Sequence, residues 1–99
     1  MPSVIVVGAG IGGLSCAVDL AARGFAVTVL EKQAWLGGKA RRVALDGQLV
    51  DAGPTSLTMP WVFDELFERA GASFRHEVTL ERAELLSRHV WHDGRRLDL

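Results

Sequence analysis

The chain has 99 residues, which is the size of one small domain. Its 11 basic and 12 acidic residues nearly cancel, so the charge gives no support for a nucleic-acid-binding protein. Hydrophobic residues make up 48% of the chain, which is typical of a globular protein and not of a disordered one. The composition therefore predicts one folded domain without a preference for polyanions.

Cysteine content and hydropathy bear on the compartment. The single cysteine, Cys16, excludes an internal disulfide and fits a reducing compartment. Because Cys16 lies among small residues of a predicted helix, we expect a small core residue and not a nucleophile. No secretory signal is recognisable, and no apolar run approaches the roughly 18–20 residues that span a bilayer. We therefore expect a cytoplasmic protein, for which peripheral contact with the cytoplasmic membrane stays open.

The first 30 residues have the pattern of a βαβ unit. Residues 4–7 are a β-branched apolar run, typical of a strand that is buried on both faces of a parallel sheet. Residues 8–13 are predicted to form a turn, and residues 14–23 a helix with one apolar face. Gly24 suits the end of that helix, and residues 25–30 repeat the strand pattern.

Two antiparallel hairpins are predicted farther along. Residues 40–51 contain two short strand-like pieces around Asp46-Gly47, a two-residue hairpin signal. Residues 84–99 repeat this arrangement around Asp93-Gly94. Between the hairpins, residues 60–70 are predicted to be a helix that begins with a proline, whereas residues 73–82 have no clear period.

The glycines at positions 8, 10 and 13 form the pattern G-x-G-x-x-G between the first strand and the first helix. Gly8 permits a tight turn, Gly10 lets a pyrophosphate approach the backbone, and Gly13 lets the helix pack closely on the sheet. The helix N-terminus then presents free N–H groups to the phosphates. An ordinary glycine turn remains the alternative interpretation.

Glu31 lies at the end of the second predicted strand, 18 positions after Gly13. A carboxylate there can accept hydrogen bonds from a ribose diol and repels a 2′-phosphate, which disfavours NADP. FAD and NAD both carry ADP, so this motif alone does not separate them. The next residues include a second glycine pair, Gly37-Gly38, and then Lys39, which could meet phosphates. An NAD dehydrogenase domain would normally continue into another helix and parallel strand, whereas this chain enters a hairpin.

Histidines and tryptophans give weaker signals. His89 and His92 would point to opposite faces of a strand, so we expect no metal site there. The three tryptophans are expected to pack in a core or an interface and not on a flavin or a polyene. They are Trp35, Trp61 and Trp91.

Several stretches together resemble a known family. VIVVGAGIGGLSCAVDLAARGFAVTVLEK, LGGKA and VDAGPTSLTMP are similar to the N-terminus of the FAD-dependent carotenoid desaturases, which belong with the flavin amine oxidases and phytoene desaturases. With WVFDELFERAGA, the likeness is greatest to the bacterial 1-hydroxycarotenoid 3,4-desaturases, also called methoxyneurosporene dehydrogenases.

The resemblance implies a fold and a chemistry. The fold class is α/β: a Rossmann-like, FAD-binding βαβ unit followed by β-hairpins and a helix, as an incomplete three-layer domain. The flavin would take a hydride from a carotenoid polyene and be reoxidised by oxygen or a quinone. Family members are several times longer. We therefore expect residues 1–99 to be the N-terminal part of the FAD domain, without the substrate domain and without turnover of their own.

The resemblance also implies cofactor contacts. The glycine loop would cradle the pyrophosphate, Glu31 would hold the adenosine ribose, and residues 53–55 would pass near the flavin ring. Asp51 is expected to be a structural hydrogen-bond partner, and no catalytic residue is assigned. The implied contacts are Gly8, Ala9, Gly10, Ile11, Gly12, Gly13, Glu31, Lys32, Gly38, Lys39, Ala40, Gly53, Pro54 and Thr55.

Three alternatives stay open. The chain could belong to a phytoene desaturase or another amine-oxidase-type flavoenzyme, to a non-catalytic dinucleotide-binding module, or to an NAD-dependent dehydrogenase, which fits poorly. Two parallel apolar strands with one short helix would leave strand edges exposed, and the oligomeric state stays open. We therefore expect the isolated chain to be a molten or associating species that binds FAD weakly.

Overall fold

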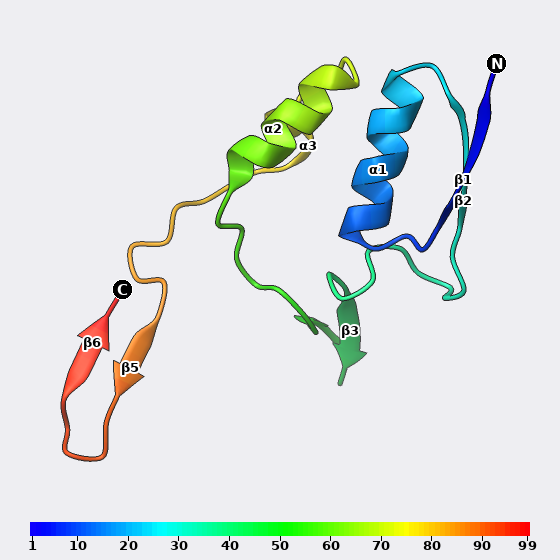
Figure 1. The fold of residues 1–99 in the computed structure, drawn as a ribbon. Coiled ribbons are helices and arrows are strands. Elements are labelled where there is room, and N and C mark those ends of the chain that lie inside the picture. Colours follow the sequence, from blue (N-terminus) through cyan, green and yellow to red (C-terminus); the bar gives the residue numbers. More distant parts are fainter.

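The computed structural model describes residues 1–99 and has a mixed α/β architecture. Figure 1 shows a βαβ unit at one end, a hairpin at the other, and helices between them. The elements in chain order are β1 (Ser3–Val7), α1 (Ile11–Ala22), β2 (Ala26–Leu30), β3 (Arg42–Leu45), β4 (Gln48–Asp51), α2 (Pro60–Arg69), α3 (Phe74–Glu77), β5 (Arg88–Val90) and β6 (Arg96–Asp98).

The predicted βαβ unit is confirmed. Strands β1 and β2 pair in parallel, in a register that joins Ser3 to Ala26 and Val7 to Leu30. Burial alternates along β1, because α1 covers only one face of this two-stranded sheet. Ile5 and Val7 are 64% and 83% exposed. The expectation of burial on both faces is therefore wrong for this chain, which supplies no second layer.

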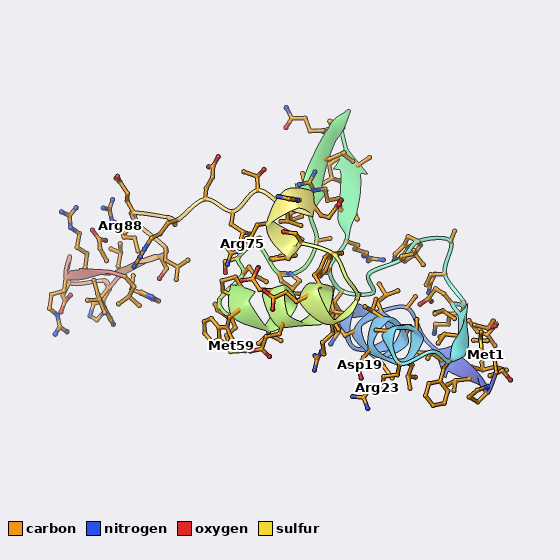
Figure 2. All side chains as sticks on the ribbon, turned by 90° about the horizontal axis from the view of Figure 1, so that it is seen from above. Met1, Asp19, Arg23, Met59, Arg75 and Arg88 are labelled. Atoms are coloured by element: carbon orange, nitrogen blue, oxygen red, sulfur yellow. The ribbon has the colours of Figure 1, made fainter.

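Helix α1 begins earlier than predicted. Its N-cap is Gly10, so residues 11–13 of the expected turn are helical. The helix ends as expected, with Arg23 as C-cap and Gly24 at a φ of 91°, in the left-handed region that glycine adopts without strain. Asp19 pairs with Arg23 at 2.9 Å, and Figure 2 shows both side chains near this end of α1.

The expectation that Cys16 is a core residue is wrong. Its side chain is exposed and lines a shallow cleft between α1 and α2. The two helices are in contact, and Arg69 of α2 lies 3.5 Å from Asp19 of α1. Helix α2 nevertheless does not close over Cys16, so a small residue in an apolar helical pattern remains accessible.

Both predicted hairpins form, and the strands of the second one are shorter than expected. In the β3–β4 hairpin, Asp46 and Gly47 have φ values of 47° and 79°, as a two-residue turn of the I′ kind requires. In the β5–β6 hairpin, Arg88 forms a two-pronged contact with Asp98, with N···O distances of 2.6 and 2.9 Å. Figure 2 shows Arg88 far from α1.

Helix α2 begins at Pro60, as predicted, and its Leu66 is buried. The short helix α3 was not predicted, because its four residues are too few to establish a period. It is held to α2 by Phe74, whose ring lies 5.4 Å from that of Phe63, and by Arg75, which donates two hydrogen bonds of 2.8 Å to Asp64.

The elements do not share one core. Only Ala9, Ala17, Leu66 and Phe74 are buried, and the accessible surface is 8207 Å², against roughly 5500 Å² for a compact protein of this mass. The radius of gyration is 17.9 Å, where about 13 Å is usual for this length. The three tryptophans are 41–55% exposed, so they are not core residues within this chain, and their packing in an interface stays a prediction. No helix is long and apolar enough to cross a membrane.

Candidate functional site

The loop between β1 and α1 is built around glycines. Gly8 has a φ of 101°, and its N–H donates to Leu30 O at 2.7 Å, so it turns the chain while still paired with β2. A Cβ on Gly13 would lie 2.0 Å from Gly8 O, so only glycine permits this close approach of helix and loop. A Cβ on Gly10 would meet nothing within 4 Å. The backbone at Gly10 therefore faces open space, as a ligand-binding loop requires.

The N-terminus of α1 is suited to an anion. The first hydrogen bond of the helix runs from Leu14 N to Gly10 O at 2.9 Å, so the N–H groups of residues 11–13 have no partner within the helix. No side chain caps this end, and no acidic residue lies in the first turn. These N–H groups and the helix dipole can therefore serve a phosphate.

Glu31 is fixed beside this loop at the end of β2. Its Oε1 accepts a hydrogen bond from the N–H of Gln33 at 3.0 Å, and its Oε2 accepts one from the N–H of Ala9 at 2.7 Å. These hydrogen bonds, from Gln33 first and then Ala9, lower the pKa of Glu31 below its usual value of 4.5. The ionised carboxylate keeps further acceptor capacity on both oxygens, which a ribose diol can use.

The second glycine pair lies directly against the loop. Gly37 donates from its N–H to Ala9 O at 2.7 Å and forms an isolated parallel bridge with Gly10. A Cβ on Gly38 would lie 3.1 Å from the Cα of Gly10. The predicted contacts included Gly38 and missed Gly37, although the adjacent glycines were the signal that could have identified it.

The segment around Gly53, which is the third glycine motif, packs against the second glycine motif around Gly37-Gly38. A Cβ on Gly53 would lie 1.8 Å from Lys39 O, which no side chain tolerates, and Ala52 N donates to Arg41 O at 2.9 Å. The chain segments around Gly10, Gly38 and Gly53 thus follow one another through backbone contacts. The structure brings together three motifs that are up to 43 positions apart in the sequence.

The remaining predicted contacts are less constrained. Lys32, Lys39, Pro54 and Thr55 are exposed, and Ala40 donates its N–H to Gly37 O at 3.0 Å within the second motif. Neither of the two lysines forms an ion pair. The geometry that is fixed by packing therefore consists of the glycine backbone and Glu31.

Asp51 and the histidines lie outside this arrangement. Asp51 Oδ1 accepts a hydrogen bond from Arg42 Nε at 3.1 Å across the β3–β4 hairpin, which agrees with a structural role. His89 belongs to β5 and His92 to the following turn. No group of three or more metal-ligating side chains gathers anywhere in the chain.

Comparison with known proteins agrees with this geometry. Residues 6–70 match the family described as NAD(P)-binding Rossmann-like domain. The chain belongs to this family. A crystal structure of a protein from Pyrococcus furiosus matches with a TM-score of 0.65 and 28% identity over 97% of this chain and 24% of that one. The Rossmann-like fold is confirmed, and its cofactor is a dinucleotide of the flavin or nicotinamide type.

The curated relatives that the chain matches are named as carotenoid desaturases and oxygenases. The chain is 53% identical over 97 residues to a hydroxyneurosporene desaturase of Rubrivivax gelatinosus, covering 97% of this chain and 18% of the relative. A hydroxyneurosporene desaturase of Cereibacter sphaeroides is 48% identical over 99 residues, covering 100% and 20%. A 4,4′-diapolycopene oxygenase of a Methylomonas species is 44% identical over 96 residues, covering 97% and 19%.

The chain thus spans about a fifth of the length of the curated relatives it matches. The predicted resemblance to the N-terminal part of the carotenoid desaturases is confirmed. The assignment of residues 1–99 to the N-terminal part of an FAD domain, without a substrate domain, stays a prediction.

Proposed function

We propose that the protein containing this chain is an FAD-dependent oxidoreductase that desaturates a carotenoid, with 3,4-desaturation of a 1-hydroxycarotenoid as the reaction. Residues 1–99 would form the cradle for the ADP half of FAD. The observation that carries this proposal is the packing of the segment around Gly38 onto the glycine loop, and of the segment around Gly53 onto Lys39. The proposal also draws on the similarity to two hydroxyneurosporene desaturases.

The choice of FAD over a nicotinamide dinucleotide follows from the path of the chain after β2. An NAD dehydrogenase domain normally continues into a helix and a third parallel strand. This chain instead forms the antiparallel β3–β4 hairpin, which returns to place Gly53 against Lys39. A segment that packs on the loop, with a further segment behind it, suits a cofactor that extends beyond the ADP group.

Each fixed group has a role in this proposal. The N–H groups at the start of α1 would bind the pyrophosphate, and the open backbone at Gly10 would let it approach. Glu31 would accept hydrogen bonds from the two ribose hydroxyls while Ala9 and Gln33 keep the carboxylate in place. Lys39 would supply a positive charge, and Pro54 and Thr55 would lie toward the flavin ring.

The reaction removes two hydrogens from the polyene, one as a hydride and one as a proton. FAD, when bound, supplies the hydride acceptor, and oxygen or a quinone would reoxidise it. The residues of this chain bind and orient the dinucleotide, and none is proposed as an acid or a base. Since a polyene dissolves in lipid, we place the protein in the cytoplasm with a peripheral contact to the cytoplasmic membrane.

The test is turnover by the full-length gene product, purified with its cofactor and supplied with a 1-hydroxycarotenoid. Chromatography and mass spectrometry of the product separate the outcomes. A product lighter by two hydrogens supports the proposal. A product that gains oxygen would favour an activity like that named for the Methylomonas relative. Bound FAD without any change in the carotenoid would overturn the proposed substrate.

A further inference from the structure

A stacked pair of side chains spans the second glycine motif. The guanidinium carbon of Arg41 lies 4.9 Å from the ring centroid of Trp35, within the range of a cation–π contact. No carboxylate lies within ion-pair distance of Arg41. The contact with Trp35 is therefore the one specific interaction that its charge makes.

The two residues of this pair flank the part of the segment that contacts the glycine loop. Between them lie Gly37, which donates to Ala9 O, and Gly38, which approaches the Cα of Gly10. One turn hydrogen bond, from Ala40 N to Gly37 O at 3.0 Å, holds this stretch internally. The stretch is neither helix nor extended strand, so side-chain contacts carry a larger share of its order.

One end of the pair is anchored independently. Arg41 O accepts a hydrogen bond from Ala52 N at 2.9 Å, and the next residue begins β3. The ring of Trp35 thus stacks on a side chain whose backbone is fixed by the β3–β4 hairpin. The contact holds Trp35 against Arg41, whose backbone is fixed, and thereby closes residues 35–41 into a loop.

We propose that Trp35 and Arg41 form a clasp that holds the Gly37-Gly38 turn against Gly10 and positions Lys39 for the dinucleotide. Both are positioning residues, because they act through the turn and not on the reacting atoms. The proposal rests on the proposed function for the identity of the dinucleotide, FAD. The order of the turn itself is independent of that identity.

The expected effect is modest and measurable. A cation–π contact at an exposed site corresponds to roughly a two- to fivefold change in an equilibrium. In the cofactor-free full-length protein, Trp35→Ala should speed amide hydrogen exchange of residues 35–41 by about this factor. The affinity for FAD should fall by a similar factor, because binding must then reorder the turn.

Matched variants separate the clasp from a general loss of packing. Trp35→Phe keeps an aromatic face and should restore most of the protection and the affinity. Arg41→Gln removes the cation and should behave like Trp35→Ala. Trp61→Ala serves as the control, because Trp61 is 55% exposed on α2 and stacks on no cation. It should leave the exchange of residues 35–41 and the affinity for FAD unchanged.

The outcomes distinguish this inference from the proposed function. If Trp35→Ala exchanges and binds FAD like the unaltered protein, or no differently from Trp61→Ala, the clasp is overturned and the proposed function stands. If the unaltered protein binds no FAD, the proposed function fails. The exchange rates of the cofactor-free protein then decide alone whether Trp35 and Arg41 hold the turn.

Discussion

The backbone N–H of Ala9 donates to Oε2 of Glu31 at 2.7 Å, which ties the glycine loop to the end of β2. Ala9 is fully buried, and its carbonyl accepts the N–H of Gly37 at 2.7 Å. The N–H of Ala9 therefore links the loop to the end of β2, and its carbonyl links the loop to the second glycine motif. The carboxylate proposed to bind the ribose thus also sets the shape of the loop that is proposed to bind the phosphates.

Substitution of Glu31 should therefore affect pH dependence as well as binding. Because its pKa is lowered in the folded chain, Glu31 contributes stability that is present above its usual pKa of 4.5 and is lost as the pH falls through the folded value. Glu31→Gln should weaken FAD binding roughly tenfold. It should also reduce the decrease in the free energy of unfolding that occurs as the pH falls. Denaturant unfolding of the full-length protein across that pH range measures the second effect. The same decrease in the free energy of unfolding in the variant and in the unaltered protein would contradict this second effect.

Gly13→Ala should disrupt the docking of α1. The added Cβ would lie 2.0 Å from Gly8 O, so the helix or the loop must move. We expect a loss of roughly 1–3 kcal/mol in the free energy of unfolding, with weaker FAD binding. Gly12→Ala is the matched control for stability, since a Cβ there meets nothing within 4 Å and alanine favours the helix. Equal stability of the two variants would contradict the close approach.

Gly53→Ala tests whether the third motif rests on the second. The added Cβ would lie 1.8 Å from Lys39 O, so residues 52–53 must separate from the second glycine motif. We expect faster hydrogen exchange around residues 37–41 and a clear loss of FAD affinity, measured by the fluorescence of released flavin. If exchange there stays as in the unaltered protein, the two motifs do not support each other.

Asp51→Asn distinguishes a structural role from acid–base catalysis. The carboxylate pairs with Arg42 across an exposed hairpin, and such a pair contributes little stability. We expect turnover of the full-length enzyme to change by less than about tenfold. The loss of a general acid or base would cost about 10²–10⁴-fold instead. A rate loss of that size, with FAD still bound, would assign Asp51 to the chemistry.

The isolated chain of 99 residues should not melt as a compact monomer. Four buried residues do not make a core, and β1 and β2 form a sheet of two strands with apolar side chains exposed on one face. We expect association or a broad thermal transition, together with weak FAD binding. Calorimetry measures the thermal transition, and light scattering measures the association. A sharp, two-state transition of a monomer would refute this expectation.

Local patterns predicted most elements, because their causes are local. Pro60 at a helix start, Gly24 at a helix end and Asp46-Gly47 in a hairpin were read correctly, since each fixes the backbone at its own position. Helix α3 and the exposure of Cys16 were missed. The first is too short for periodicity, and the second depends on how α2 packs against α1.

The candidate site was only partly predictable. The roles predicted for Gly8 and Gly13 follow from the glycine pattern. The structure has the turn at Gly8 and the close approach of the helix at Gly13. The contact of Gly53 with Lys39 O joins residues 14 positions apart through a hairpin. Neither this contact nor the pairing of Trp35 with Arg41 follows from local sequence, because each depends on where the chain returns.

The most direct test of the central claim is to identify the cofactor that the full-length protein releases on denaturation. The protein should be purified from its native host, and the released compound analysed by chromatography and mass spectrometry. We expect FAD, near one molecule per chain, and a large loss of FAD in Gly13→Ala. Release of NAD, or the absence of any dinucleotide from a folded protein, would contradict the assignment of the glycine loop and Glu31 to FAD.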